Sequence, residues 1–65
     1  MIRLTDANGL MVFVEPLQIC RVHEADQDAK SRGTLAYVYT TDGEYIAARE
    51  SAFDINSFCV AARQS

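Results

Sequence analysis

The sequence has one histidine, two cysteines and three glycines, and this scarcity argues against several kinds of site. With His23 as the only histidine, no pair of histidines can hold a metal ion. A Cys–His nucleophile would need Cys20 or Cys59 beside His23, but Cys20 and His23 lie three residues apart on an expected strand and therefore point to opposite faces. Glycine-rich phosphate loops and the Gly-x-Ser-x-Gly element are absent. We therefore expect a protein that is not an enzyme, with no catalytic residue, metal site or cofactor.

Long apolar runs are also missing. No run approaches the roughly 18 residues that span a bilayer. Residues 1–10 lack the basic stretch and apolar run of a signal peptide, so we expect a cytoplasmic protein with no membrane partner. In a reducing cytosol Cys20 and Cys59 are expected to be free thiols in or near the core, and a disulfide between them is the less favoured alternative.

Basic residues are few, with six Lys and Arg against nine Asp and Glu, and they are scattered along the chain. Nucleic-acid binders usually carry a basic patch and have a high pI, so binding to nucleic acid is disfavoured. The acidic residues Glu24, Asp26 and Asp28 alternate in one segment and raise the question of a calcium site. An EF-hand loop needs a bidentate Glu at its twelfth position, where this chain has Leu35, so a solvated loop is the preferred interpretation.

The length of 65 residues predicts one domain, residues 1–65. Hydrophobic residues make up 49% and charged residues 23%, which is typical of globular proteins. A domain of this size buries only about 60% of the surface that its unfolded chain exposes, and small domains often gain stability by oligomerisation. A homodimer is therefore one of the partner hypotheses.

Apolar alternation and turn residues predict five strands. The expected strands cover residues 2–5, 10–14, 19–23, 34–40 and 44–48. Asn8-Gly9 predicts a type I′ turn after the first strand, and Asp42-Gly43 predicts a turn before the fifth. The second strand is apolar throughout, so we expect both of its faces to be partly covered until Pro16 ends it and a single helical turn follows. The polar segment 24–33 is expected to be a long loop.

A helix is expected over residues 52–62, because Ser51 and Asp54 resemble a capping box. Residues at helical spacing are expected to face the core, namely Ile55, Phe58, Cys59 and Ala62. The sequence therefore predicts an α+β protein in which a five-stranded antiparallel sheet, built from hairpins, is followed by one C-terminal helix.

The order of these motifs resembles the small flagellar and swarming-motility FlbD family. The matching positions are Met1, Ile2, Leu4, Thr5, Asn8, Gly9, Pro16, Ile19, Asp42, Gly43, Glu50 and Ser51. The similarity spans nearly the whole chain and brings no catalytic residues with it. It implies a motility-related protein that acts by binding another protein. Related proteins also occur in phages, so for a phage-encoded relative the partner would be a host protein.

A second face of the expected helix provides the candidate site. Phe53 and Val60 lie seven residues apart, with Asn56 and Ser57 on the same stripe. We expect these four residues to form a partner-binding surface, since large aromatic residues are typical interface anchors. Two alternatives remain, an ordinary solvent-facing stripe with isolated apolar residues and a rotated helix in which Phe53 belongs to the core.

Tyrosines on the fourth expected strand extend this candidate site. Tyr37 and Tyr39 share one face of the strand, and Ala36 and Val38 share the other. We expect Tyr37 and Tyr39 to join the helix stripe in binding a protein partner or a second copy. The alternative function is a platform, with Tyr45, for a small ligand or single-stranded nucleic acid. Ordinary cross-strand packing of the rings is the third interpretation.

Overall fold

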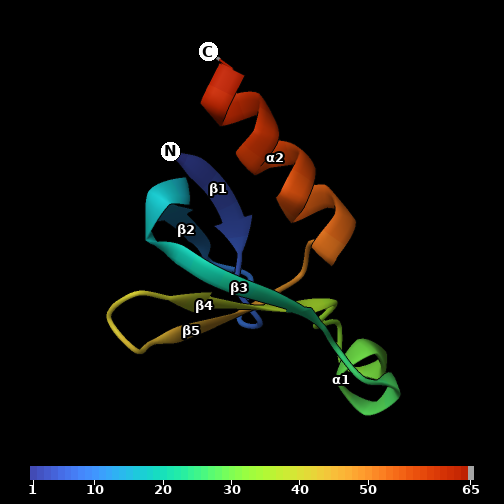
Figure 1. Ribbon diagram of the computed structural model, residues 1–65. Coiled ribbons are helices and arrows are strands. Elements are labelled where there is room, and N and C mark those ends of the chain that lie inside the picture. Colours follow the sequence, from blue (N-terminus) through green and yellow to red (C-terminus); the bar gives the residue numbers. More distant parts are fainter. Residues whose placement is uncertain (65) are drawn as a thin grey trace.

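The computed structural model describes residues 1–64 and contains five strands and a long C-terminal helix (Figure 1). The elements in chain order are β1 (Ile2–Thr5), β2 (Met11–Val14), the 3-10 turn η1 (Pro16–Gln18), β3 (Ile19–Glu24), α1 (Gln27–Ser31), β4 (Ala36–Thr40), β5 (Tyr45–Ala48) and α2 (Ala52–Gln64). The predicted α+β class, the five strands and the C-terminal helix are confirmed. The backbone N–H of Asp54 donates to the Ser51 hydroxyl over 3.1 Å, as the predicted N-terminal cap requires.

The strands form two antiparallel sheets, so the prediction of one five-stranded sheet is wrong. One sheet pairs β1 with β2, and the other has the order β3-β4-β5. The break lies at Pro16, where η1 turns the chain between β2 and β3. The two sheets meet at one corner, where Asp6 bridges to Ala48 and the Arg49 N–H donates to the Thr5 carbonyl over 2.8 Å.

The turn after β1 differs from the predicted type I′ turn. A type I′ turn centred on Asn8 and Gly9 requires a positive φ at both residues; Gly9 has a φ of +84°, but no non-glycine residue of the described chain has a positive φ, so Asn8 does not meet this requirement. The Gly9 N–H donates to the Asp6 carbonyl over 3.0 Å, and the Asn8 N–H donates to the Asp6 carboxylate over 2.9 Å. This loop is therefore a type I turn followed by a left-handed glycine, held by an Asp side chain.

The segment 24–33, expected to be a loop, contains the short helix α1. Asp26 caps it by accepting from the Ala29 N–H, and Ala29 is buried. At the other end Gly33 has a φ of +95°, its N–H donates to the Lys30 carbonyl, and the Thr34 N–H donates to the Ala29 carbonyl. These bonds form a Schellman motif. One of the acidic residues considered for calcium thus caps a helix.

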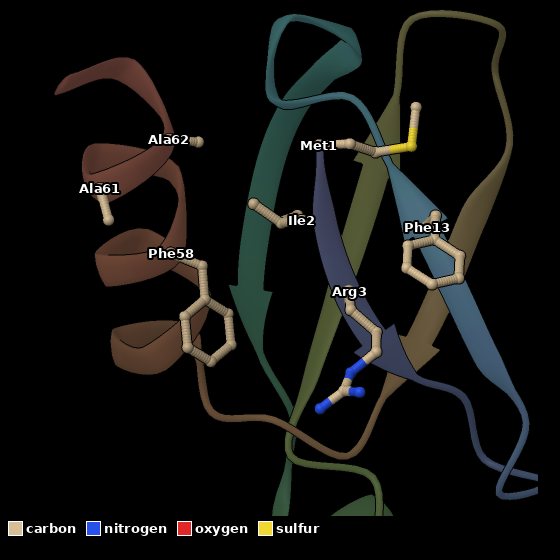
Figure 2. A pocket seen from close by; sticks show the side chains of 7 residues that line it. All are labelled: Met1, Ile2, Arg3, Phe13, Phe58, Ala61 and Ala62. Atoms are coloured by element: carbon tan, nitrogen blue, oxygen red, sulfur yellow. The ribbon is translucent and has the colours of Figure 1, made fainter. Parts of the chain in front are cut away.

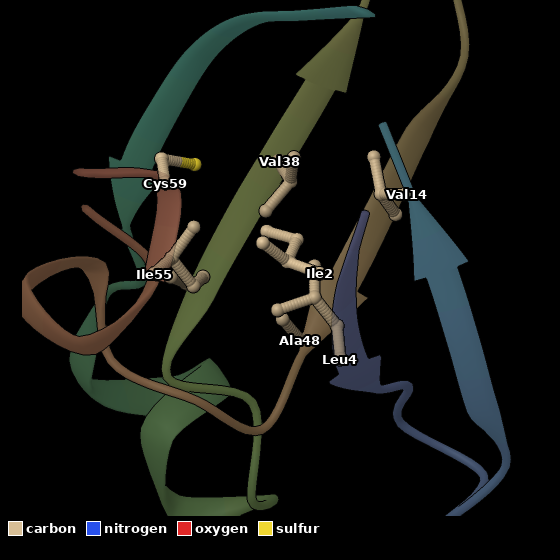
Figure 3. Packing of buried hydrophobic residues seen from close by; sticks show 8 residues of the cluster. Ile2, Leu4, Val14, Val38, Ala48, Ile55 and Cys59 are labelled. Carbon is tan, nitrogen blue, oxygen red and sulfur yellow. The ribbon is translucent and has the colours of Figure 1, made fainter. Parts of the chain in front are cut away.

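The core lies between the two sheets and α2, which packs against β1 and β3 (Figure 1). Leu4, Val38 and Ile55 are its largest fully buried side chains. Figure 3 shows α2 directing Ile55 and Cys59 towards residues of β1, β4 and β5. The buried cluster consists of Ile2, Leu4, Val14, Ala36, Val38, Ala48, Ile55 and Cys59.

Four apolar residues are more exposed than the sequence predicted. Cys20 is exposed beside an irregularity in the β3–β4 pairing, whereas Cys59 is buried as expected, and both are free thiols. Phe58 is 40% exposed, because it lies at the edge of the helix face that Ile55 and Cys59 centre. Met11 and Phe13 are also exposed, since no described segment covers the outer face of the β1–β2 sheet.

Paired substitutions on α2 test which face of the helix supports the fold. Ile55→Ala removes a fully buried side chain and is expected to lower the free energy of unfolding by about 2–5 kcal/mol. Phe53→Ala removes a side chain that is 78% exposed and should change it by less than about 0.5 kcal/mol. Urea denaturation followed by circular dichroism measures both. If Ile55→Ala does not fold, Ile55→Val takes its place, with an expected loss of about 0.5–1.5 kcal/mol. Equal losses at the two positions would contradict this packing.

Candidate functional site

Large apolar and aromatic side chains lie exposed on several parts of the molecule. They are Met1, Leu10, Met11, Phe13, Leu17, Tyr39, Tyr45, Phe53, Phe58 and Val60. Single exposed apolar residues are normal, but groups of them mark interaction sites. Most of these residues belong to three surfaces, which differ in shape and chemistry.

The first surface is a groove between α2 and the β1–β2 hairpin, here named the α2–β1 groove (Figure 2). Its volume is about 610 Å³. Met1, Phe13 and Phe58 are the large exposed side chains along it, at 74%, 61% and 40% exposure. The residues that line it are Met1, Ile2, Arg3, Phe13, Phe58, Ala61 and Ala62.

The pairing of β1 with β2 explains the composition of this groove. Arg3 lies opposite Phe13, and Ile2 lies opposite Val14. Because successive side chains of a strand alternate between faces, Ile2 and Val14 enter the core while Arg3 and Phe13 point outward. In the view of Figure 2, Arg3 of β1 lies between Phe13 and Phe58 and its guanidinium extends beyond both rings, where its Nη1 atom is 3.8 Å from the Met11 Sδ atom. The groove therefore has apolar walls and one cation.

The second surface is the predicted stripe on α2, here named the helix stripe. Phe53, Asn56, Ser57 and Val60 are all exposed, with Phe53 at 78% and Val60 at 41%. The alternative in which Phe53 belongs to the core is therefore excluded. The helix has this rotation because its opposite face carries Ile55 and Cys59, which are buried in the core.

The third surface, the tyrosine face, is the outer side of the β3-β4-β5 sheet. The rings of Tyr39 and Tyr45 have centroids 6.0 Å apart, and Tyr37 lies 6.1 Å from Tyr45. On β3 the His23 ring packs edge-on against Tyr39 at 5.5 Å, and its Nε2 atom lies 3.3 Å from the Arg21 Nη1 atom. Aromatic rings from all three strands thus form one continuous cluster with a guanidinium group beside it.

The structure does not bring the two parts of the predicted site together. Val38 of β4 is buried in the same cluster as Ile55 of α2. Because side chains alternate along β4, Tyr37 and Tyr39 point away from the core that α2 covers. The helix stripe and the tyrosine pair therefore belong to separate surfaces.

Sequence reasoning missed the groove residues Met1 and Phe13 and placed Phe58 in the core. The alternation of residues 11–14 was a usable signal, because it sets Phe13 on the face opposite Val14. It could not show that this face would remain uncovered. Arg21 and His23 were likewise missed beside the tyrosines, although their spacing on an expected strand places both on one face.

Hydrogen bonds from the Thr40 hydroxyl and the Glu44 N–H hold the pKa of Asp42, in the β4–β5 turn, below its usual value of 3.8. Among residues 1–64 no three His, Cys, Asp or Glu side chains gather in a way that could hold a metal ion. Within the same range, none of the helices has the length and apolar character needed to cross a membrane.

No family model, curated protein or solved structure matches this chain.

Proposed function

We propose that this protein is a non-enzymatic interaction module that binds a protein partner through the α2–β1 groove. The observation that carries this proposal is the gathering of Met1, Phe13 and Phe58, from three separate parts of the chain, around one open groove. Exposed apolar residues that collect around a concave surface are typical of protein-binding sites, and aromatic residues are frequent anchors there.

The chemistry of the groove defines the kind of segment that fits it. Its apolar walls suit an aliphatic or aromatic side chain, and the Arg3 guanidinium at its edge suits a neighbouring carboxylate. Covering Phe13 or Phe58 would contribute on the order of 1–2 kcal/mol each, from about 25 cal/mol per Å² of apolar surface removed from water. We therefore infer that the partner presents an apolar anchor next to an acidic residue.

The resemblance to the FlbD family suggests where such a partner would be found. If the chain is a motility protein, the segment belongs to a component of the flagellar apparatus or its regulation. If the chain is encoded by a phage, the segment belongs to a host protein that is inhibited or redirected.

A second candidate function uses the tyrosine face. Three tyrosines and His23 form a continuous ring cluster across three strands, with Arg21 at one side. Sheet surfaces with exposed aromatic rings and nearby cations can stack the bases of single-stranded nucleic acid. The net charge of −3 opposes this function, so the binding of a short oligonucleotide or a planar small ligand ranks second.

Affinity capture with groove variants tests the first proposal. Phe13→Asp places a charge in the groove at a residue that is 61% exposed, so the fold is expected to persist. The amount of captured partner is expected to fall by at least about tenfold. Leu17→Asp is the matched control, because Leu17 is 78% exposed but does not line the groove. Proteins captured from lysates of motile bacteria by the two variants and the wild type are compared by quantitative mass spectrometry.

The pattern of capture decides the outcome of this test. A protein retained by wild type and Leu17→Asp and lost from Phe13→Asp supports the groove. Capture of the same proteins by both variants contradicts it. Circular dichroism spectra of the variants confirm that a loss is not caused by unfolding.

Titration with short single-stranded oligonucleotides tests the second candidate. Base stacking on the tyrosine face would quench tyrosine fluorescence, and the quenching would weaken as salt rises. Tyr39→Leu should remove most of the response, and Arg21→Gln should lower the salt dependence if Arg21 contacts a phosphate. An absence of quenching at low salt eliminates nucleic acid as a ligand of this face.

A further inference from the structure

We propose that the partner segment binds in the α2–β1 groove as an added β-strand, paired with the free edge of β1. This inference rests on the proposed function, because it concerns the same groove. It adds the backbone conformation of the bound segment and the order of its side chains.

The hydrogen bonds of β1 show which of its main-chain groups face the groove. The Asp6 N–H donates to the Leu10 carbonyl over 2.9 Å, so these two residues form a hydrogen-bonded pair at the end of the β1–β2 ladder. In an antiparallel ladder such pairs alternate with pairs whose main-chain groups point away from each other. Arg3 and Thr5 therefore direct their N–H and carbonyl groups away from β2. Figure 2 shows β1 lying between α2 and β2, so these groups face the helix side.

One part of this edge is already paired within the chain. At Thr5 the Glu50 carboxylate accepts the N–H, and the Arg49 N–H donates to the carbonyl. Two residues along the edge, no described residue forms a hydrogen bond with the Arg3 N–H or carbonyl. The chain leaves this edge to form α2, which begins at Ala52. The free position at Arg3 thus continues an edge that already accepts a neighbouring segment, and unpaired edges of this kind are templates for strand addition.

The lining of the groove indicates that it follows the strand edge. Met1, Ile2 and Arg3 are consecutive in the sequence, and all three line it. Because successive side chains of a strand alternate between faces, three consecutive residues share one groove where the groove runs along the edge. Phe58 and Ala61 of α2 line the other side. A strand in the groove would therefore pair with β1 on one side and contact α2 on the other.

Pairing with β1 fixes the order of side chains in the added strand. The residue opposite Arg3 shares the outer face with the Arg3 side chain, where a carboxylate forms a cross-strand pair with the guanidinium. The residues on either side of it share the inner face with Ile2, beside the small Ala62 of α2, and apolar side chains fit there. The bound segment therefore has the order apolar, acidic, apolar.

A second copy of the chain fits the same edge less well. An antiparallel pair of β1 strands centred on Arg3 would set the two Arg3 side chains opposite each other, and like charges directly opposite destabilise strand pairing. Charged residues on edge strands commonly prevent self-association in this way. The free edge therefore favours an acidic segment of another protein over a second copy.

NMR titration with a pair of peptides tests strand addition. The probe is the pentapeptide Thr-Ile-Asp-Ile-Thr with acetyl and amide ends, and the control is the same peptide N-methylated at Asp, which cannot donate to the Arg3 carbonyl. The Arg3 amide should exchange rapidly with solvent in the free protein and about fivefold or more slowly with saturating probe. N-methylation should weaken binding by at least about fivefold.

Each other result of the titration counts against strand addition. Shifts at Phe13 and Phe58 without protection of the Arg3 amide overturn it and leave binding in the groove intact. An Arg3 amide that is protected in the free protein, as pairing with a second copy would cause, also overturns it, as does equal affinity for the two peptides. No shifts up to about 5 mM probe overturn it as well. The capture experiment with Phe13→Asp decides the groove itself independently.

Charge reversal at Arg3 tests the order of side chains. Arg3→Glu should weaken binding of the probe by about threefold or more, and a probe with Lys in place of Asp should restore it. Arg21→Glu is the matched control, because Arg21 is also an exposed arginine on a strand but does not line the groove, and it should leave the affinity unchanged. A loss at Arg3→Glu that the Lys peptide does not restore overturns the proposed register.

Discussion

The structure depends on the corner at which Thr5 of β1 meets the segment between β5 and α2. The Glu50 carboxylate accepts the Thr5 N–H at 2.9 and 3.1 Å, and the Thr5 carbonyl accepts the Arg49 N–H at 2.8 Å. A carboxylate that accepts a backbone N–H forms a charge-assisted hydrogen bond, which is stronger than a neutral one. These bonds tie the two sheets together immediately before Ser51 caps α2. They therefore fix where the helix begins and the direction in which it crosses β1 and β3.

The position of α2 determines both the core and the surfaces outside it. With about half of its residues hydrophobic and only 65 residues in total, the chain cannot bury all of its apolar side chains. The helix covers the core with Ile55 and Cys59, and the hairpin covers it with Ile2, Leu4 and Val14. Several of the apolar side chains left outside the core gather in the α2–β1 groove and along the helix stripe. The exposed apolar surface is thus a consequence of a small two-sheet core closed by a single helix.

The sequence predicted those parts of the structure that depend on local patterns. Alternation located the five strands, and the Ser51 cap and helical spacing located α2, whereas the spacing left open whether Phe53 faces solvent or the core. The division into two sheets was not predictable in the same way, because it depends on contacts such as that between Thr5 and Glu50, 45 residues apart. Helix α1 did have local signals in Asp26 and Gly33, but the polar composition of its segment favoured a loop. The α2–β1 groove was missed because it exists only once β1, β2 and α2 have packed together. The helix stripe lies on a single helix, so the spacing of its residues was enough to identify it.

The three faces of α2 can serve separate purposes because of how they are distributed around its axis. At 100° per residue, the buried face centred on Ile55 and Cys59, the helix stripe and the groove-lining pair Phe58 and Ala61 point in directions about 120° apart. A segment bound in the α2–β1 groove would therefore contact neither the buried face of α2 nor the helix stripe. Partner binding in the groove would leave the packing of Ile55 and Cys59, and with it the fold, unchanged.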